Sequence, residues 1–153
     1  GFPADHVCEV HGSIRYLQCA SACSDRIWPA SDFRPDVDAG ECRLLNELPQ
    51  CPACGGLARP NILMFGDWGW VERRTELQYQ RLQEWLAAVD RLVCIEIGAG
   101  SNIATVRRFS EQQAGHLVRI NPNEPGVPGN GRSIGLALGG RQGIAALVAA
   151  IGG

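Results

Sequence analysis

The stretch RLVCIEIGAGSN, residues 91–102, decides the fold class of this 153-residue chain. Its first part is a short apolar run of the kind found in the buried strands of parallel sheets. Its second part is a glycine-rich turn of the kind that joins such a strand to a helix. A strand, a glycine turn and a helix in this order predict an α/β fold.

The sequence on both sides of this stretch continues the alternation. Residues 73–90 predict an amphipathic helix whose apolar face carries Leu77, Leu82, Trp85, Leu86 and Val89. Residues 103–115 and 141–151 predict two further helices, and residues 116–120 and 133–138 predict strands. This order predicts a parallel sheet with helices on its faces and with ligand sites beyond the carboxyl ends of its strands.

Two candidate ligand-binding segments follow predicted strands directly. Gly98 and Gly100 allow the backbone to approach a phosphate group, although glycine turns of this kind also occur without a ligand. Asn121 follows the next strand, where its amide can hold a ribose hydroxyl or can simply shape the turn before Pro122.

Cysteine content indicates a metal site upstream of this region. The odd count of seven fits metal ligation in a reducing compartment better than a closed set of disulfides. Cys51 and Cys54 form the tight turn CPACGG, and Cys19 and Cys23 form the slightly wider CASAC. Together they predict a four-thiolate structural zinc site, with Zn–S bonds of about 2.3 Å. The alternative for the CASAC pair is that both are small buried hydrophobic residues.

The remaining cysteines have other expected roles. Residues 24–50 show no sustained periodicity, so the metal site is expected to hold this segment in its folded conformation. Cys42 lies in this loop and could replace Cys23 as a ligand. Cys8 and Cys94 lie in apolar contexts that read as strands and are predicted to be core residues.

Composition excludes several classes of function. The net charge is −2, so the chain lacks the excess of basic residues that favours binding to nucleic acid or to an anionic membrane. No apolar run is long enough to span a bilayer, and residues 1–10 lack the layout of a secretory signal. These features predict a cytoplasmic protein without nucleic-acid or membrane partners.

Several motifs form one pattern when taken in order. EVHGSIRYLQC at residues 9–19 reads as an extended strand carrying His11 and a glycine, and CPACGGLARPNILMFGD follows at residues 51–67. With the glycine turn and RIN at residues 119–121, the chain resembles the sirtuin family of NAD-dependent protein-lysine deacylases over nearly its whole length. The resemblance implies a partial Rossmann-like fold with a small zinc-ribbon lobe. The corresponding divisions are residues 1–18 for the histidine segment, 19–60 for the zinc lobe and 61–153 for the carboxyl-terminal half of the NAD-binding lobe.

The resemblance also implies a reaction and a set of site residues. The reaction is acyl-lysine deacylation, with nicotinamide, free lysine and O-acyl-ADP-ribose as products. His11 matches the general base, a task that suits an imidazole because histidine side chains in general titrate near pH 6.5. His6 and His116 are expected to be surface or packing residues.

The resemblance implies substrate and cofactor contacts as well. The acyl-lysine tunnel is matched by Leu63, whose carbonyl would accept the lysine amide hydrogen, and by Met64, Phe65 and Gly66. The alternative for this segment is a buried strand edge. The NAD contacts are matched by Gly98, Ala99, Gly100, Ser101, Asn121, Gly140 and Arg141.

This sequence departs from the family pattern in several places. GAG stands where Gly-Thr-Ser is usual, which removes two hydroxyl donors that Ser101 replaces only in part. Asp67 stands where glutamate is usual, WGW follows it, and the first cysteine pair is one residue wider than usual. The amino-terminal nucleotide loop and the Gln-Asn-x-Asp motif do not precede residue 1. The chain is therefore expected to be the carboxyl-terminal portion of a sirtuin-like enzyme, weakly active or inactive unless an upstream segment completes the NAD site.

Other functions remain open from the sequence. One is a non-catalytic, zinc-stapled module that binds NAD, ADP-ribose or a peptide. Another is a relative that transfers ADP-ribose to protein or hydrolyses NAD. A purely structural zinc ribbon explains the pattern least well, because it leaves His11, the glycine turn and RIN without a shared role.

Overall fold

The computed structural model describes residues 1–113 and 115–152 and divides into two compact units, Gly1–Ala87 and Ala88–Gly153. Ala114, in the predicted helix of residues 103–115, and Gly153, in the predicted NAD-binding lobe, lie outside the described residues. The predicted lobe boundaries after residues 18 and 60 fall within strands of the first unit. That functional division remains a prediction.

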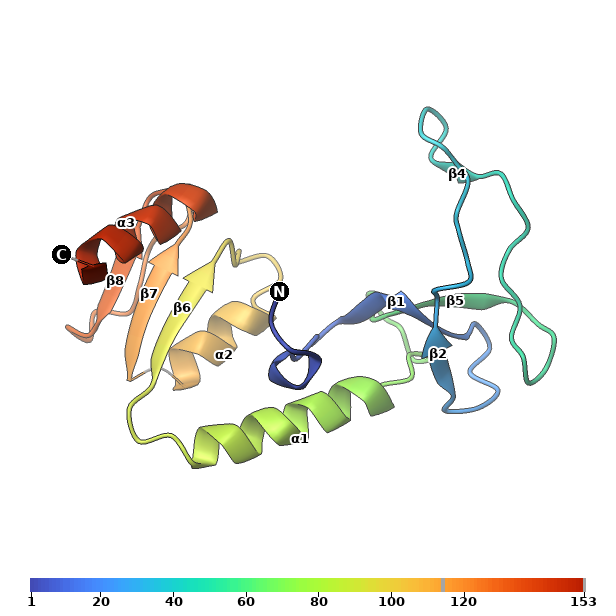
Figure 1. Ribbon diagram of the computed structural model, residues 1–153, viewed down its shortest axis with the longest axis horizontal. Helices are drawn as coiled ribbons and strands as arrows, with labels where there is room; N and C mark the ends of the chain where they lie inside the picture. The colour runs from blue at the N-terminus through green and yellow to red at the C-terminus, as the bar shows by residue number, and fades with distance from the viewer. Residues whose placement is uncertain (114, 153) are drawn as a thin grey trace. The chain divides into compact units, whose positions relative to one another are not determined.

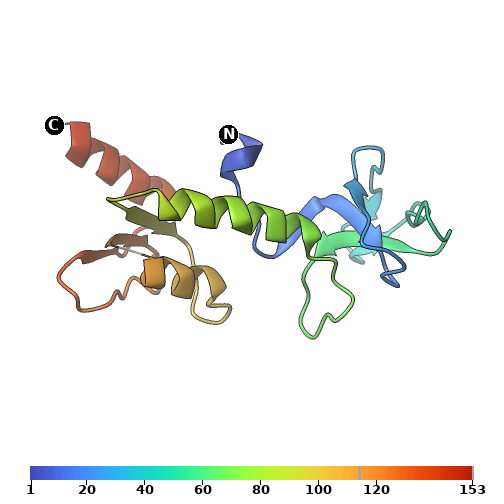
Figure 2. The same ribbon diagram turned by 90° about the horizontal axis from the view of Figure 1, so that it is seen from below.

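The second unit is a parallel sheet with a helix on each face (Figure 1 and Figure 2). Its strands β6 (Val93–Ile97), β7 (His116–Ile120) and β8 (Ser133–Leu136) lie in the order β6-β7-β8. Helix α2 (Thr105–Gln113) joins β6 to β7, and helix α3 (Gly140–Gly152) follows β8. The α/β prediction and its parallel sheet are confirmed, because each predicted strand and helix in this unit forms.

Alternation along the strands assigns the two faces of this sheet. Glu96 lies on the α2 face, where the Ser110 hydroxyl of α2 donates a hydrogen bond to it. Ile120 lies on the α3 face, and a Cβ added at Gly143 would fall 2.4 Å from an Ile120 methyl carbon. A Cβ here would fit only if the Ile120 side chain shifted, so Gly143 favours the close packing of α3 against the sheet.

Strand β6 differs from its prediction in one respect. Its apolar run predicts a strand buried on both faces, but Val93, Ile95 and Ile97 are 57%, 55% and 47% exposed. These three side chains share one face, and β6 is an edge strand of the described sheet. The prediction of a buried strand is therefore wrong for this face, because the described residues do not cover it.

The first unit is built around a three-stranded antiparallel sheet. Strand β1 (Gly12–Cys19) is central and pairs with β2 (Ile27–Pro29) on one side and β5 (Ala58–Ile62) on the other. Leu17, Gln18 and Cys19 are buried in it. A short 3-10 helix η1 (Ala4–His6) precedes the sheet, and helix α1 (Arg73–Ala87) follows it. A two-stranded hairpin of β3 (Val37–Asp38) and β4 (Arg43–Leu44) extends from the sheet (Figure 1).

Three local expectations need correction. Residues 24–50 contain short strands despite their lack of periodicity, because β2 gains its order from pairing with β1. Cys8 follows η1 instead of lying in a strand, and it is half-buried, as is Cys94 in β6. Burial raises the pKa of both thiols.

Helix α1 forms where it was predicted, but its apolar face is largely open. Leu77 and Trp85 are 51% and 55% exposed, and the buried residue of the helix is Gln78. Val89 lies beyond the helix end. Among the described residues, no helix combines the length and the apolar character that crossing a bilayer requires.

Candidate functional site

His11 lies in a turn immediately before β1, not in the strand that its context predicts. The Gly12 amide donates to the Glu9 carbonyl over 2.9 Å and closes the turn. The Leu63 amide then donates to the His11 carbonyl over 3.0 Å. The predicted catalytic histidine and the predicted acyl-lysine segment are therefore joined through the backbone, although they are far apart in sequence.

Gly12 is the residue that makes this junction possible. Its φ is +78°, in the left-handed region that favours glycine. A Cβ at this position would lie 2.0 Å from the Asn61 carbonyl oxygen of β5. The glycine of the His-Gly pair thus allows β5 to approach β1 closely beside His11.

Helix α1 holds the other side of the His11 turn. The Glu9 amide donates to the Gln78 side-chain carbonyl over 2.9 Å, and the Thr75 hydroxyl donates to the Glu9 carbonyl over 3.1 Å. The Glu9 carboxylate forms an ion pair with Arg74, whose guanidinium also lies 4.0 Å from the centre of the Tyr16 ring. Burial is the largest single effect and would raise the pKa of Glu9. The hydrogen bond from Arg74 and several weaker contacts together outweigh burial, so the pKa of Glu9 is lowered.

A buried amide network fixes the chain after β5. Gln18 and Asn61 are both fully buried, and the Asn61 amide donates to the Gln18 side-chain oxygen over 2.9 Å. The same oxygen accepts from the Val71 amide over 3.0 Å, and the Gln18 amide donates to the Gly69 carbonyl over 2.7 Å. Residues 69–71 are thereby tied back to the sheet, so the chain between β5 and this anchor projects as a loop.

The loop of residues 63–68 presents apolar side chains to solvent. Phe65 is 88% exposed and Trp68 is fully exposed. The expected alternative of a buried strand edge is wrong, because β5 ends at Ile62. Asp67 holds the loop: its carboxylate pairs with Arg59 at 2.8 Å and accepts from the Gly69 amide over 3.2 Å. Burial alone would raise the pKa of Asp67, but hydrogen bonds led by that from Arg59 lower it.

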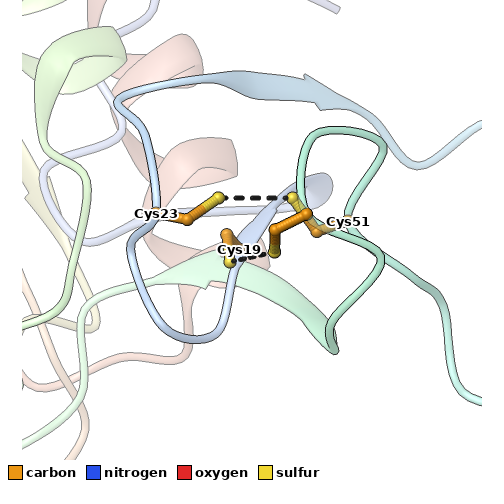
Figure 3. Close-up of side chains that lie close together, drawn as sticks. Cys19, Cys23 and Cys51 are labelled. Atoms are coloured by element: carbon orange, nitrogen blue, oxygen red, sulfur yellow. Dashed lines mark hydrogen bonds between the residues drawn. The ribbon is translucent and has the colours of Figure 1, made fainter.

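Four of the cysteines converge in the first unit (Figure 3). The sulfur atoms of Cys19, Cys23, Cys51 and Cys54 all lie within 4.8 Å of one another. Cys19 and Cys54 are 3.7 Å apart, as are Cys23 and Cys51. A tetrahedral zinc ion with Zn–S bonds of about 2.3 Å separates its ligand sulfurs by roughly 3.8 Å. The spacing of this cluster therefore fits such an ion, and Cys42 lies outside the cluster on the β3–β4 hairpin.

The ionisation of the four thiols would be favoured by a bound cation. The backbone amide of Cys23 outweighs the effect of burial and, with smaller contributions, lowers the pKa of Cys19 to about 6. Hydrogen bonding to the neighbouring sulfurs, first that of Cys19, raises the pKa of Cys23 to about 12. The crowded thiols compete for ionisation, and a bound divalent cation would allow all four to ionise together.

In the second unit, the predicted cofactor residues gather at the carboxyl edge of the sheet. The Gly98 amide donates to the Ile120 carbonyl over 2.9 Å, and Gly98 has a φ of +71°. A Cβ added at Gly140 would lie 3.0 Å from Ile97, which places the start of α3 at the same edge. Arg141 follows it and is exposed. These candidate residues therefore lie at the carboxyl ends of the strands, and a ligand site there stays a prediction.

Asn121 is engaged by the chain itself. Its side-chain amide donates to the Ala99 carbonyl over 3.1 Å, and its oxygen accepts from the Asn123 and Glu124 amides over 3.0 Å and 2.9 Å. This is the turn-shaping role that its sequence context also allows. A ribose contact by Asn121 stays a prediction, and it would use the second hydrogen of the amide.

Sequence reasoning missed two residues at this edge, Glu124 and Arg107. The Glu124 carboxylate accepts from the Ser101 hydroxyl over 2.6 Å and from the Ser101 amide over 2.8 Å. The Arg107 guanidinium donates to the Glu124 and Gly126 carbonyls over 3.2 Å and 3.0 Å. Neither residue lies in a recognisable motif, so only the fold brings them to the glycine turn.

Comparison with known proteins agrees with these features. The sequence model of the Sir2 family matches residues 1–103, which include His11, the cysteine cluster, the projecting loop and the glycine turn.

The chain belongs to the Sir2 family.

Curated Sir2 relatives match over much of this chain. An "NAD-dependent protein deacylase" of Thermococcus sibiricus is 26% identical over 130 residues, 80% of this chain and 44% of the relative. The "NAD-dependent protein deacylase sirtuin-5, mitochondrial" of Danio rerio is 29% identical over 126 residues, 75% of this chain and 39% of the relative. The chain thus spans less than half the length of these relatives. A solved structure titled "The Structural basis for Sirtuin Substrate affinity" matches 94% of this chain and 56% of its own at 20% identity, with a TM-score of 0.49.

Proposed function

We propose that this protein is an NAD-dependent protein-lysine deacylase that releases nicotinamide, deacylated lysine and O-acyl-ADP-ribose. The observation that carries the proposal is the hydrogen bond from the Leu63 amide to the His11 carbonyl, which joins the histidine turn to the apolar loop. The Sir2 family match over residues 1–103 and the deacylase names of curated relatives support it.

Each part of the first unit has a role in this proposal. His11 acts as the general base that accepts a proton from a ribose hydroxyl of the bound dinucleotide. Leu63, Met64, Phe65 and Gly66 receive the acyl-lysine side chain of a protein or peptide. Their apolar surface excludes water from the acyl group, and the Arg59–Asp67 pair holds the loop in shape.

The cysteine cluster would hold a structural zinc ion through Cys19, Cys23, Cys51 and Cys54. Four thiolates leave no open position for a substrate, so the ion would stabilise the fold and take no part in the reaction. Its place is next to β1, because Cys19 is the last residue of the strand that begins beside His11.

The second unit would bind the dinucleotide at the carboxyl edge of its sheet. Gly98, Ala99, Gly100 and Ser101 would face its phosphates, while Asn121, Gly140 and Arg141 would lie toward the adenosine. NAD supplies the electrophilic ribose carbon from which nicotinamide leaves. A cytoplasmic location stays a prediction.

The decisive experiment measures nicotinamide release from NAD with and without an acetyl-lysine peptide. It is performed on the 153-residue chain and on the full product of its gene. The expected result is peptide-dependent release from the full product that disappears in His11→Ala with zinc content unchanged, and weak or no release from the 153-residue chain. The matched control is His6→Ala, which removes an imidazole on η1 and is expected to leave release unchanged.

Three results would contradict the proposal. Deacylation at a near-normal rate in His11→Ala would remove His11 from the role of general base. Binding of ADP-ribose without any nicotinamide release would indicate a non-catalytic module, whereas a mass increase on the target protein would indicate ADP-ribosyl transfer.

A further inference from the structure

The Ser101 donors in the glycine turn are already occupied by an anion, the carboxylate of Glu124. One carboxylate oxygen accepts from the Ser101 hydroxyl over 2.6 Å and the other accepts from the Ser101 amide over 2.8 Å. A hydroxyl and an adjacent backbone amide are the donors that proteins commonly offer to a phosphate oxygen. The contact therefore shows that this turn binds an anionic oxygen pair.

The backbone of Glu124 is anchored by contacts that do not involve its carboxylate. The Glu124 amide donates to the Asn121 side-chain oxygen over 2.9 Å, and the Arg107 guanidinium donates to the Glu124 carbonyl over 3.2 Å. The Glu124 side chain itself is 39% exposed. The hydrogen bonds from Ser101 are the main cause that lowers the pKa of Glu124. The side chain can thus leave the turn while the loop that carries it stays anchored.

Arg107 would remain beside the turn after the carboxylate leaves. Its guanidinium lies 3.6 Å from a Glu124 carboxylate oxygen, and its side chain is only 16% exposed. It also donates to the Ala99 carbonyl over 3.4 Å and to the Gly126 carbonyl over 3.0 Å, contacts that do not depend on the Glu124 side chain. A vacated turn would therefore keep two hydrogen-bond donors and a positioned cation.

We propose that Glu124 closes the glycine turn as an internal competitor, so that a phosphate group entering the turn must displace its carboxylate from Ser101. This rests on the proposed function, because it names the group that limits dinucleotide binding at the proposed site. A carboxylate and a phosphate are both negative and cannot share the same pair of donors without strong repulsion. The resident carboxylate consequently lowers the affinity of the turn for phosphate.

The test titrates inorganic diphosphate, and separately ADP-ribose, into the full chain while the amide resonance of Ser101 is followed by NMR. Glu124→Gln removes the charge and keeps the size of the side chain, and Glu124→Ala removes the competing group. Both variants are expected to bind diphosphate roughly three- to tenfold more tightly than the unmodified chain.

A matched control separates local competition from a general change in charge. Asp90→Asn also removes one exposed carboxylate from the second unit, but Asp90 precedes β6 whereas the glycine turn follows it. It is expected to leave diphosphate affinity unchanged. Ser101→Ala combined with Glu124→Gln is expected to lose most of the gain, because the hydroxyl donor is then missing for the phosphate too.

Each other outcome overturns the inference. Equal or weaker diphosphate binding in both Glu124 variants would make Glu124 a neutral residue or a ligand-binding group. No response of the Ser101 amide in any variant would show that the turn is not an anion site. The proposed deacylase function is judged separately by nicotinamide release, which can be absent while the Glu124 variants still tighten diphosphate binding.

Discussion

At the scale of single residues, a few positions determine how close two segments can come. Gly12 and Gly143 each lie where a Cβ would overlap another group, the Asn61 carbonyl in one case and the Ile120 side chain in the other. The two obstacles differ in kind. A methyl group can be displaced by a side-chain rotation, whereas a strand carbonyl moves only if the backbone pairing changes.

Gly12→Ala is expected to destabilise the first unit by more than about 2 kcal/mol, because it adds a backbone clash to an unfavourable positive φ. The measurement is denaturant unfolding followed by a signal from the first unit. Gly69→Ala is the control: its nearest neighbour would be an Asp67 oxygen at 3.8 Å, and its φ is not in the left-handed region, so a change within about 0.5 kcal/mol is expected. Equal effects of the two substitutions would contradict the steric argument.

At the scale of elements, the parallel sheet is held to α2 by a buried ion pair. Arg119 on β7 and Glu96 on β6 face each other across paired positions, and both side chains are 1% exposed. The Ser110 hydroxyl of α2 donates to the Glu96 carboxylate, and Arg119 also pairs with Glu111 of α2 at 2.7 Å. Because the charges are paired and hydrogen-bonded, they specify how β6, β7 and α2 fit together.

Glu96→Gln is expected to destabilise the second unit by roughly 3–5 kcal/mol, because it removes the main counter-charge of a buried guanidinium. Glu111→Gln is the matched control. It alters the same arginine's second partner, whose side chain is 33% exposed, and is expected to cost about 1 kcal/mol or less. Hydrogen exchange at β7 amides distinguishes the two, and similar exchange rates in both variants would contradict a central role for Glu96.

Acid should weaken the same sheet through Glu96. Burial would raise the pKa of Glu96, but the hydrogen bonds from Arg119 and Ser110 and the charges of Arg119 and Arg107 together outweigh burial and lower the pKa from its ordinary 4.5. A carboxyl with a lowered pKa in the folded state contributes stability above pH 4.5. That contribution is lost as the pH falls through the lower, folded-state pKa. The stability of the second unit, measured from pH 6 downward, should therefore fall below about pH 4.5. The part of this fall that is due to Glu96 should be absent in Glu96→Gln.

At the scale of the whole molecule, the two units depend on different kinds of stabilisation. The second unit has a sheet with a helix on each face, whereas the first has short strands, long loops and the cysteine cluster. A short-stranded lobe with little core gains folding free energy from a bound metal ion, because the site exists only in the folded chain. Loss of metal is therefore expected to affect the two units unequally.

Cys51→Ser is expected to lower bound zinc and to increase amide exchange in β1, β2 and β5, while β6, β7 and β8 stay protected. The matched control is Cys42→Ser, which replaces an exposed cysteine outside the cluster and should retain both metal and protection. Metal analysis combined with hydrogen exchange makes the comparison, and a chelator should reproduce the effect of Cys51→Ser. Unchanged zinc in Cys51→Ser would remove this cluster as the metal site.

The sequence alone determined the order of elements and the family. Helices α1, α2 and α3 and strands β6, β7 and β8 follow from periodicity and glycine turns, which are properties of neighbouring residues along the chain. The two cysteine pairs and the His-Gly pair are also local motifs, so their chemistry could be recognised before any contact was known.

Only the tertiary structure decided which distant groups meet. It brought four of seven cysteines together, joined the His11 turn to Leu63, and placed Glu124 on Ser101. It also left β6 and α1 with exposed apolar faces that their patterns predict to be buried. Periodicity records which side of an element is apolar, but burial and partner choice depend on contacts between segments far apart in sequence. Those contacts are set by close backbone approach at residues such as Gly12 and by buried polar pairs such as Glu96 and Arg119.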